Sequence, residues 1–166
     1  RLWRVTGVQT CALPICFMHI RRCEERDREL YLRLAREFYH SPAVMHPVPD
    51  SYFERTFDEM MRSDVYADGF LLEDEDGTCM GYALTAKSFS QECGGQCVWV
   101  EELYVLPAYQ GKGMGSRVFE LLNAYYPDCC RFRLEVEPEN EGAARLYRRL
   151  GYEALGYDQY VLERQE

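Results

Sequence analysis

The sequence predicts one domain of the α/β class (α+β), in which strands and amphipathic helices share a single core. The chain has 166 residues, a length typical of one domain. Hydrophobic residues make up 47% and charged residues 28%, the balance of a globular protein rather than a disordered one. Segments with the apolar spacing of helices alternate with segments of high β-propensity, so both element types are expected throughout.

The first 17 residues are left out of the fold prediction. Residues 5–15 show no periodicity and resemble the conceptual translation of a sequencing adapter. A short secretory signal is the alternative, since Arg1 and Arg4 precede an apolar patch, but polar residues and Pro14 interrupt that patch. Residues 1–17 are therefore interpreted as non-native, and residues 18–166 as a single domain.

The first part of this domain predicts a strand and two helices. Residues 18–22 have strand character, and in residues 24–39 apolar side chains recur every four positions, as on one face of a helix. The proline-rich residues 40–49 interrupt helical structure. Ser51 and Glu54 then match a capping box, which predicts the start of a second helix.

The rest of the domain begins with three strands joined by turns. Residues 69–73 and 80–89 flank the hairpin signal Asp76-Gly77, and a turn at residues 92–96 leads into a strand at residues 97–105. The remaining predicted elements are a helix opened by the loop Gln110–Gly115 and running to about Tyr126, a strand at residues 131–137, a helix at residues 140–150 ended by Gly151, and strands at residues 152–155 and 157–162.

Charge and cysteine content restrict the class of partner and site. The chain carries 19 basic and 28 acidic residues, a net charge of −9, which argues against a nucleic-acid interface and favours a cationic amine or a basic peptide. No apolar stretch approaches the roughly 18 residues that cross a membrane. Six of the eight cysteines follow Met18, without paired CxxC spacing, so no metal site is expected. Free thiols and the absence of a signal pattern predict a cytoplasmic protein.

The central chemical signal is a glycine-rich turn between a predicted strand and a predicted helix, Gln110-Gly111-Lys112-Gly113-Met114-Gly115-Ser116. Glycines let main-chain amides approach a ligand closely, and a helix N-terminus directs unpaired N–H groups at an anion such as phosphate. A P-loop needs Ser or Thr after Lys112, where Gly113 stands, and a dinucleotide fingerprint needs glycine where Ser116 stands. The turn therefore predicts a different phosphate-containing ligand.

The pattern Gln110-x-x-Gly113-x-Gly115, preceded by Leu103-Tyr104-Val105-Leu106-Pro107, resembles the pyrophosphate-binding motif of the GNAT acyltransferase superfamily. The resemblance extends over roughly residues 18–162, and its second block consists of Leu134-Glu135-Val136, Asn140, Ala143-Ala144, Leu146-Tyr147 and Leu150-Gly151-Tyr152. It implies a mixed, mostly antiparallel central sheet with helices on both faces and splayed fourth and fifth strands.

The same resemblance implies acetyl-CoA as acyl donor, with its pantetheine arm between the splayed strands. The implied binding groups are the main chain of Leu103, Tyr104 and Val105, the loop residues Gln110, Gly111, Lys112, Gly113, Met114, Gly115 and Ser116, and Asn140. Asn140 is also a suitable helix cap, which explains an asparagine there without any ligand.

Acyl transfer to an amine needs a proton acceptor for the amine, donors for the oxyanion and a proton for the departing thiolate. Tyr147 matches the family tyrosine that protonates the coenzyme A sulfur, and a core tyrosine packed with Leu146 and Leu150 is the alternative role. Glu135, Glu102 and Glu101 compete as the base, Glu101 and Glu102 lying on opposite faces of one strand. The alternative for Glu135 is an ion pair with a neighbouring arginine, Arg131 or Arg133.

These expectations together indicate an N-acetyltransferase that transfers the acetyl group directly to a primary amine of a small molecule or peptide. The sequence places no Cys–His or Ser–His pair for nucleophilic catalysis, so a covalent acyl-enzyme is not expected. His46, in the proline-rich connection, could assist proton removal. The alternatives are a non-catalytic acyl-CoA-binding regulatory module and a nucleotide-phosphate binder. A homodimer is compatible with the sequence, but no feature specifies an interface.

Overall fold

The computed structural model describes residues 18–41, 44 and 46–164. The interpretation of residues 1–17 lies outside this range. The chain divides into two compact units, one ending at Glu135 and one beginning at Val136, and each is described by itself.

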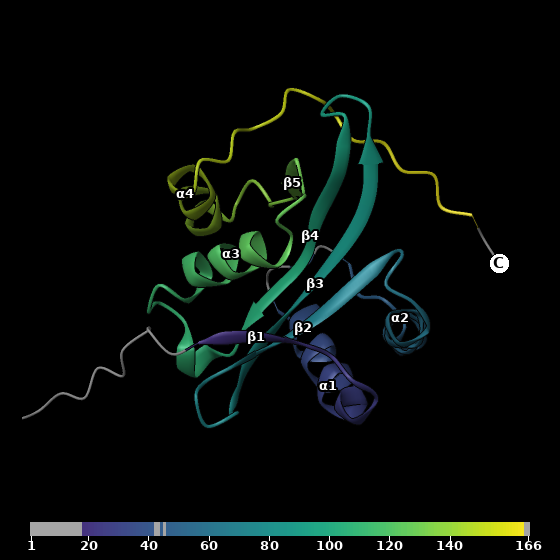
Figure 1. The fold of residues 1–166 in the computed structure, drawn as a ribbon, viewed down its shortest axis with the longest axis vertical. Helices are drawn as coiled ribbons and strands as arrows, with labels where there is room; N and C mark the ends of the chain where they lie inside the picture. Colours follow the sequence, from purple (N-terminus) through teal and green to yellow (C-terminus); the bar gives the residue numbers. More distant parts are fainter. Residues whose placement is uncertain (1–17, 42–43, 45, 165–166) are drawn as a thin grey trace, which may run out of the picture. The chain divides into compact units, whose positions relative to one another are not determined.

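The first unit is built on a five-stranded sheet whose strand order follows the sequence (Figure 1). Its strands are β1 (His19–Arg22), β2 (Ala67–Glu73), β3 (Cys79–Ser90), β4 (Gly95–Val105) and β5 (Arg131–Leu134). Neighbouring strands pair antiparallel except β4 and β5, which pair in parallel. The expectation of a mixed, mostly antiparallel sheet is confirmed.

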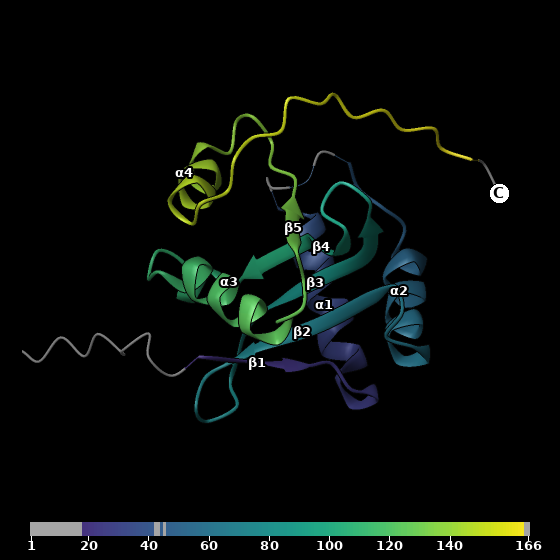
Figure 2. The same ribbon diagram turned by 45° about the horizontal axis from the view of Figure 1, so that its top comes forward.

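Helices cover both faces of this sheet, as predicted (Figure 2). On one face, α1 (Arg28–Tyr39) and α2 (Asp50–Arg62) contribute aromatic and aliphatic side chains to a core shared with Leu71 and Tyr82. On the other face lies α3 (Met114–Tyr125), where Tyr125 packs edge-on against Phe70 with ring centroids 4.7 Å apart. Because both faces are covered, β2 is apolar at successive positions rather than alternating.

Two predicted details of the N-terminal half are corrected. The first helix is preceded by a short 3-10 turn, Glu25–Asp27. The capping box at Ser51 is wrong: α2 begins at Asp50, and its N-cap is Pro49, in an extended conformation and without a side-chain cap. Asp50 instead occupies the first turn, where the helix dipole favours an acidic residue, and it pairs with Arg36 at 2.7 Å.

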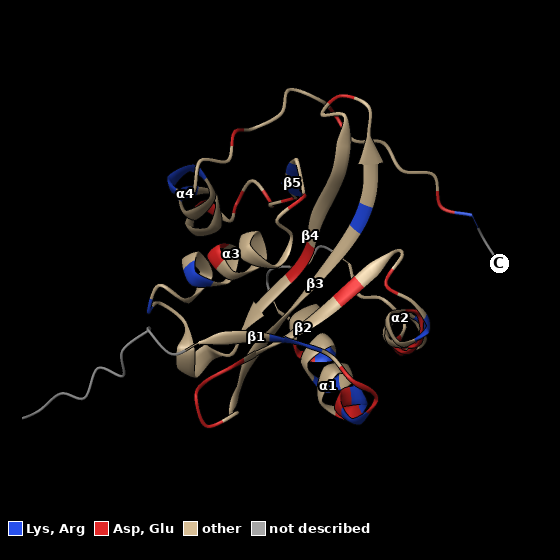
Figure 3. Ribbon diagram, in the orientation of Figure 1, with Lys and Arg blue, Asp and Glu red and all other residues tan. Residues whose placement is uncertain are grey.

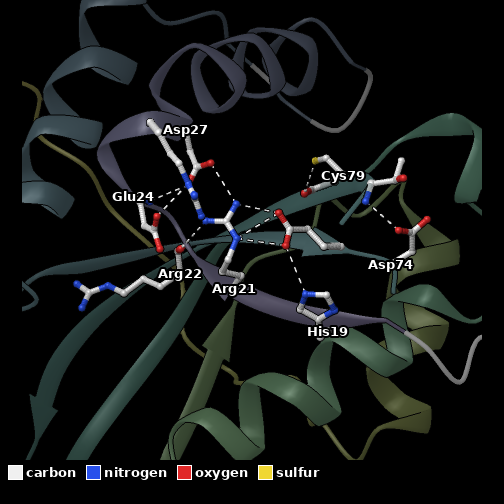
Figure 4. Close-up of polar contacts among 11 residues, drawn as sticks. His19, Arg21, Arg22, Glu24, Asp27, Asp74 and Cys79 are labelled. Carbon is white, nitrogen blue, oxygen red and sulfur yellow. Dashed lines mark hydrogen bonds and ion pairs between the residues drawn. The ribbon is translucent and has the colours of Figure 1, made fainter. Parts of the chain in front are cut away.

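A polar network ties β1 to the end of β2 and to the start of the first helical segment (Figure 4). Arg21 donates to Asp27 at 2.7 Å and to Glu73 at 2.8 Å, and His19 lies 3.3 Å from Glu73. Both carboxylates are buried, so a charged partner offsets their lost hydration. The hydrogen bonds from Arg21 are the main cause that lowers the pKa of Asp27.

The second unit contains α4 (Glu141–Arg149), whose N-cap Asn140 accepts a hydrogen bond of 3.1 Å from the Ala143 amide. Gly151 follows the helix with φ +88°, as expected for a left-handed C-terminal residue. The strands predicted at residues 152–155 and 157–162 are wrong, because the structure assigns no strand to residues 152–164. The main-chain groups of a strand need hydrogen-bond partners on a neighbouring strand. Alternating side chains alone do not provide such a neighbour.

Within the described part of the chain, no helix has the length and apolarity needed to cross a membrane.

Candidate functional site

Among the described residues, no strand pairs with the second half of β4 on the edge that faces β5, and this half is called the open edge. The parallel pairing runs from Cys97 opposite Arg131 to Val100 opposite Leu134 and goes no further, although β4 continues to Val105. The strand predicted at residues 131–137 is thus shorter than expected, ending at Leu134. This divergence is the predicted splaying of the fourth and fifth strands.

Main-chain groups at this open edge can be assigned from the β3–β4 ladder. Leu106 donates from its amide to the carbonyl of Met80 at 2.9 Å, so its main chain points toward β3. Alternate residues of an antiparallel strand point the same way, which places the amides of Leu103 and Val105 on the opposite, open side. The Val105 carbonyl indeed accepts a hydrogen bond of 2.7 Å from the Gln110 side chain instead of from β3.

A β-bulge in β4 occurs where the pairing with β5 stops. Val100 lies opposite Thr85 and Glu102 opposite Leu84, so Glu101 is an extra residue without a partner on β3. The bulge reverses the alternation of side chains. Thr85 contacts Tyr126 beside α3, whereas Leu84 belongs to the core under α1 and α2. Glu102 consequently faces α1 and α2.

Glu102 is buried, and both of its carboxylate oxygens are hydrogen-bonded. Tyr82 on β3 donates to one at 2.5 Å, and Tyr39 at the end of α1 donates to the other at 2.9 Å. Desolvation raises the pKa of Glu102, and the two phenol hydroxyls oppose that shift. Neither tyrosine was predicted as a site residue, because neither belongs to a motif.

Glu101, the extra residue of the bulge, is not part of this buried core. Its side chain is exposed, and desolvation followed by the negative charge of Glu135 raises the pKa of Glu101. Glu135 is also exposed and comes directly after β5. The two carboxylates therefore flank the point where β4 and β5 separate.

The ion pair considered as an alternative role for Glu135 does not form. Arg131 pairs with Glu92 at 2.6 Å, and Arg133 pairs with the same carboxylate at 3.2 Å. Glu92 lies in the turn between β3 and β4, so the two arginines connect this turn to β5. This is the end at which β4 and β5 are paired, called here the closed end of the β4–β5 pair. The Glu135 carboxylate is left without a salt bridge among the described residues.

The glycine-rich loop follows β4 through a single 3-10 turn, Pro107–Tyr109. Gly111 and Gly113 have φ values of +74° and +77°, the left-handed region that favours glycine. Gly113 is the N-cap of α3, so the amides of Met114 and Gly115 have no acceptor within the helix. These donors, at the positive end of a helix, suit a diphosphate.

The longer side chains of this loop contact the loop itself. Gln110 bonds to Val105, as described above, and Lys112 donates to the Ala108 carbonyl at 3.0 Å. The ammonium group of Lys112 also lies 5.8 Å from the centre of the Tyr109 ring. Side chains thus brace the turn, which leaves main-chain amides as its candidate ligand-binding groups.

The second unit carries the two other predicted site residues. Asn140 caps α4, which confirms the structural alternative considered for it. The Tyr147 ring packs against Tyr152 with centroids 6.0 Å apart, and desolvation raises the pKa of Tyr147. A phenol with a raised pKa is fully protonated at neutral pH and can serve as a proton donor. His46, by contrast, is exposed in the connection between α1 and α2.

Comparison with known proteins adds a family match and named relatives. The model of the acetyltransferase (GNAT) family matches residues 27–152. The thialysine N-epsilon-acetyltransferase of Mus musculus is 29% identical over 147 residues, which cover 82% of this chain and 84% of the mouse protein. The spermine/spermidine N(1)-acetyltransferase of Bacillus subtilis (strain 168) is 27% identical over 86 residues, 49% of this chain and 57% of that protein.

A solved structure gives the same fold. The aminoglycoside N-acetyltransferase AAC(6')-Iy, in complex with the bisubstrate analog CoA-S-monomethyl-acetylneamine, superposes with a TM-score of 0.70 at 18% identity. The match covers 89% of this chain and 99% of the other. At this identity the likeness concerns the fold.

Proposed function

Because this chain belongs to the acetyltransferase (GNAT) family, we propose that it transfers the acetyl group of acetyl-CoA directly to a primary amine. Membership makes it an acyltransferase, and the sequence-based identification of the family is confirmed. The acyl donor, the direct route and the residues that act are parts of the proposal.

The observation that carries the proposal is the continuity between the open edge of β4 and the N-terminus of α3. A single 3-10 turn separates the last strand residue, Val105, from the loop with left-handed Gly111 and Gly113. A thioester with an extended, amide-containing arm and a diphosphate needs donors of these two kinds in this order. The edge amides of Leu103 and Val105 would bind the arm, and the amides of Lys112–Ser116 the diphosphate.

In the reaction, the amine nitrogen attacks the thioester carbonyl carbon and the bond from that carbon to sulfur breaks. An edge amide of β4 donates to the carbonyl oxygen as negative charge develops on it. A carboxylate of the chain accepts the proton that the ammonium group must lose, and Tyr147 supplies a proton to the departing thiolate.

Among the three carboxylates, the geometry favours Glu101 together with Glu135 as the proton acceptor. Both are exposed where β4 and β5 diverge, and the raised pKa of Glu101 makes that carboxylate a stronger base. Glu102, the base favoured by the sequence analysis together with Glu135, uses both oxygens to accept phenol hydrogen bonds. The catalytic role of Glu102 is untested, and we propose that Glu102 positions Tyr39 and Tyr82 instead.

A cationic amine is the proposed acceptor. The chain has a net charge of −9, which attracts a cation, and relatives are named for acting on thialysine and on spermine and spermidine. A peptide amine is the second acceptor class and is included in the test.

The test is a panel of amines assayed for acetyl-CoA-dependent release of free thiol. The panel comprises thialysine, lysine, spermidine, an aminoglycoside and a basic peptide, with an uncharged alcohol as control. Turnover with at least one amine and none with the alcohol supports the proposal. Silence across the panel, combined with tight binding of acetyl-CoA, would favour a non-catalytic binding module. A thermal shift with ATP but not with acetyl-CoA would identify a nucleotide-phosphate binder.

A further inference from the structure

Three cysteine sulfurs meet at the surface where the β3–β4 turn approaches the segment before β5. The sulfur of Cys93 lies 2.6 Å from that of Cys130 and 3.4 Å from that of Cys97. All three residues are free thiols in the structure. The cluster lies at the closed end of the β4–β5 pair, away from the open edge described above.

The fold holds Cys93 and Cys130 close together through contacts of the main chain and of neighbouring residues. The Cys130 amide donates to the Gln96 carbonyl at 3.0 Å, which joins the two segments through the main chain. Gly95 leaves room for the Cys130 sulfur, because a Cβ atom at position 95 would lie only 2.9 Å from it. Glu92, next to Cys93, is held by Arg131, next to Cys130, at 2.6 Å.

The three thiols differ in access and in acidity. Cys130 is exposed and Cys93 partly exposed, whereas Cys97 is buried. The contact with Cys130 lowers the pKa of Cys93, and the same contact raises the pKa of Cys130 to about 11. The lowered pKa favours Cys93 as the attacking thiol, because the thiolate is the reactive form of cysteine.

We propose that Cys93 and Cys130 form a reversible disulfide by exchange with a low-molecular-weight disulfide, so that the pair is a redox modification site. The Cys93 thiolate attacks one sulfur of the small disulfide, forms a mixed disulfide and releases one small thiol. Cys130 then loses its proton, attacks the Cys93 sulfur and releases the second small thiol. The protein loses two protons and two electrons, and the small disulfide gains them.

The bridge would enclose most of the proposed acetyl-CoA site in one covalent loop. Residues 93–130 contain β4, the glycine-rich loop and α3, and the bond would close this segment at its two ends. A sulfur–sulfur bond is about 2.05 Å long, so the two sulfurs need to approach by only about half an ångström. The inference does not depend on which reaction the protein catalyses.

The experiment uses the full chain in buffers of oxidised and reduced glutathione, with intact mass and non-reducing peptide mapping as readouts. In oxidising buffer we expect a mass lower by two hydrogens and a single Cys93–Cys130 cross-linked peptide, both reversed by excess reduced glutathione. The variant C130S should accumulate a glutathione adduct on Cys93. The variant C129S, which changes the adjacent cysteine, should form the bridge as the unchanged chain does.

Three results would overturn the proposal. In the first, Cys93 and Cys130 both remain thiols at a ratio of oxidised to reduced glutathione that oxidises an ordinary vicinal dithiol. In the second, the unchanged chain stops at a glutathione adduct on Cys93. In the third, the cross-linked peptide joins Cys93 to Cys97, which would make the buried thiol the resolving group.

Discussion

The hydroxyl of Tyr82 donates a hydrogen bond of 2.5 Å to the carboxylate of Glu102. The bond crosses from β3 to β4 just beyond the bulge and lies under α1, whose Tyr39 occupies the other carboxylate oxygen. This contact holds the start of the open edge against the core. Figure 3 shows an acidic stretch within β4, in a sheet that otherwise carries few charges.

The first prediction concerns the variant Tyr82→Phe. Removing the hydroxyl leaves a buried carboxylate one donor short, which should lower the free energy of unfolding by about 1.5–3 kcal/mol. Chemical denaturation measures this loss. Tyr66→Phe, at a position 61% exposed, is the matched control and should leave stability nearly unchanged. Equal effects of the two substitutions would show that the Glu102 contact contributes no stability.

The second prediction is a pH dependence that involves Glu101 and Glu135. The pKa of Glu101 lies above the ordinary value of 4.5, so its basic form, and with it kcat/KM, should decline as pH falls through that raised value. Glu135→Gln removes a negative charge that contributes to the shift. The acid limb of the profile should therefore move to lower pH, whereas Glu101→Gln should abolish the limb and most of the activity.

The control for these profiles is Glu75→Gln, in the turn between β2 and β3. Its side chain is exposed and belongs to a different end of the chain's first unit, so the pH profile should match that of the unchanged protein. If Glu102→Gln, and not Glu101→Gln, removes the acid limb without unfolding the protein, the base is the buried carboxylate.

The third prediction separates backbone strain from ligand binding in the glycine-rich loop. Gly113→Ala places a side chain at φ +77°, which costs about 1–2 kcal/mol and distorts the N-terminus of α3. We expect the KM for acetyl-CoA to rise about tenfold or more. Gly77→Ala imposes the same strain at φ +76° in the β2–β3 turn. It should cost similar stability and leave this KM unchanged, as steady-state kinetics and denaturation of both variants will test.

How far the sequence predicts this molecule depends on whether a feature is local. The glycine-rich turn, the left-handed Gly151 and the Asn140 cap each follow from a few adjacent residues, and each appears as predicted. The pairing of β2 with β3 and of β3 with β4 also follows, because a short turn joins the strands of each pair. The open edge was expected from the family resemblance.

The features that escaped prediction depend on distant residues. The bulge at Glu101 is one extra residue in β4, and alternation of side chains does not reveal where it falls. Tyr39 reaches Glu102 across 63 positions of the sequence, and Tyr82 across 20. The strands predicted after Gly151 fail for the same reason, because their alternating side chains do not specify a partner strand.

The fourth prediction concerns Tyr147. If its phenol protonates the departing thiolate, Tyr147→Phe should reduce kcat on the order of 100-fold and leave the affinity for acetyl-CoA nearly unchanged. Calorimetric binding and steady-state kinetics on the same preparation distinguish the two quantities. Tyr152→Phe, at the ring that packs against Tyr147, is the control for a purely structural role. Unchanged turnover in Tyr147→Phe would remove this residue from the mechanism.

The last prediction follows from the network that fixes β1. Hydrogen bonds from Arg21 lower the pKa of Asp27 in the folded protein below its ordinary value of 3.8. The stabilisation is therefore complete above that ordinary value and is lost as pH falls through the lowered one. Asp27→Asn cannot titrate, so its unfolding free energy should be lower than that of the unchanged protein at pH 7, and the difference should shrink toward pH 2.

Denaturation at a series of pH values measures the difference, with Asp76→Asn, exposed in the β2–β3 turn, as control. A difference that stays constant with pH would show that Asp27 stabilises the fold by packing rather than by its charge.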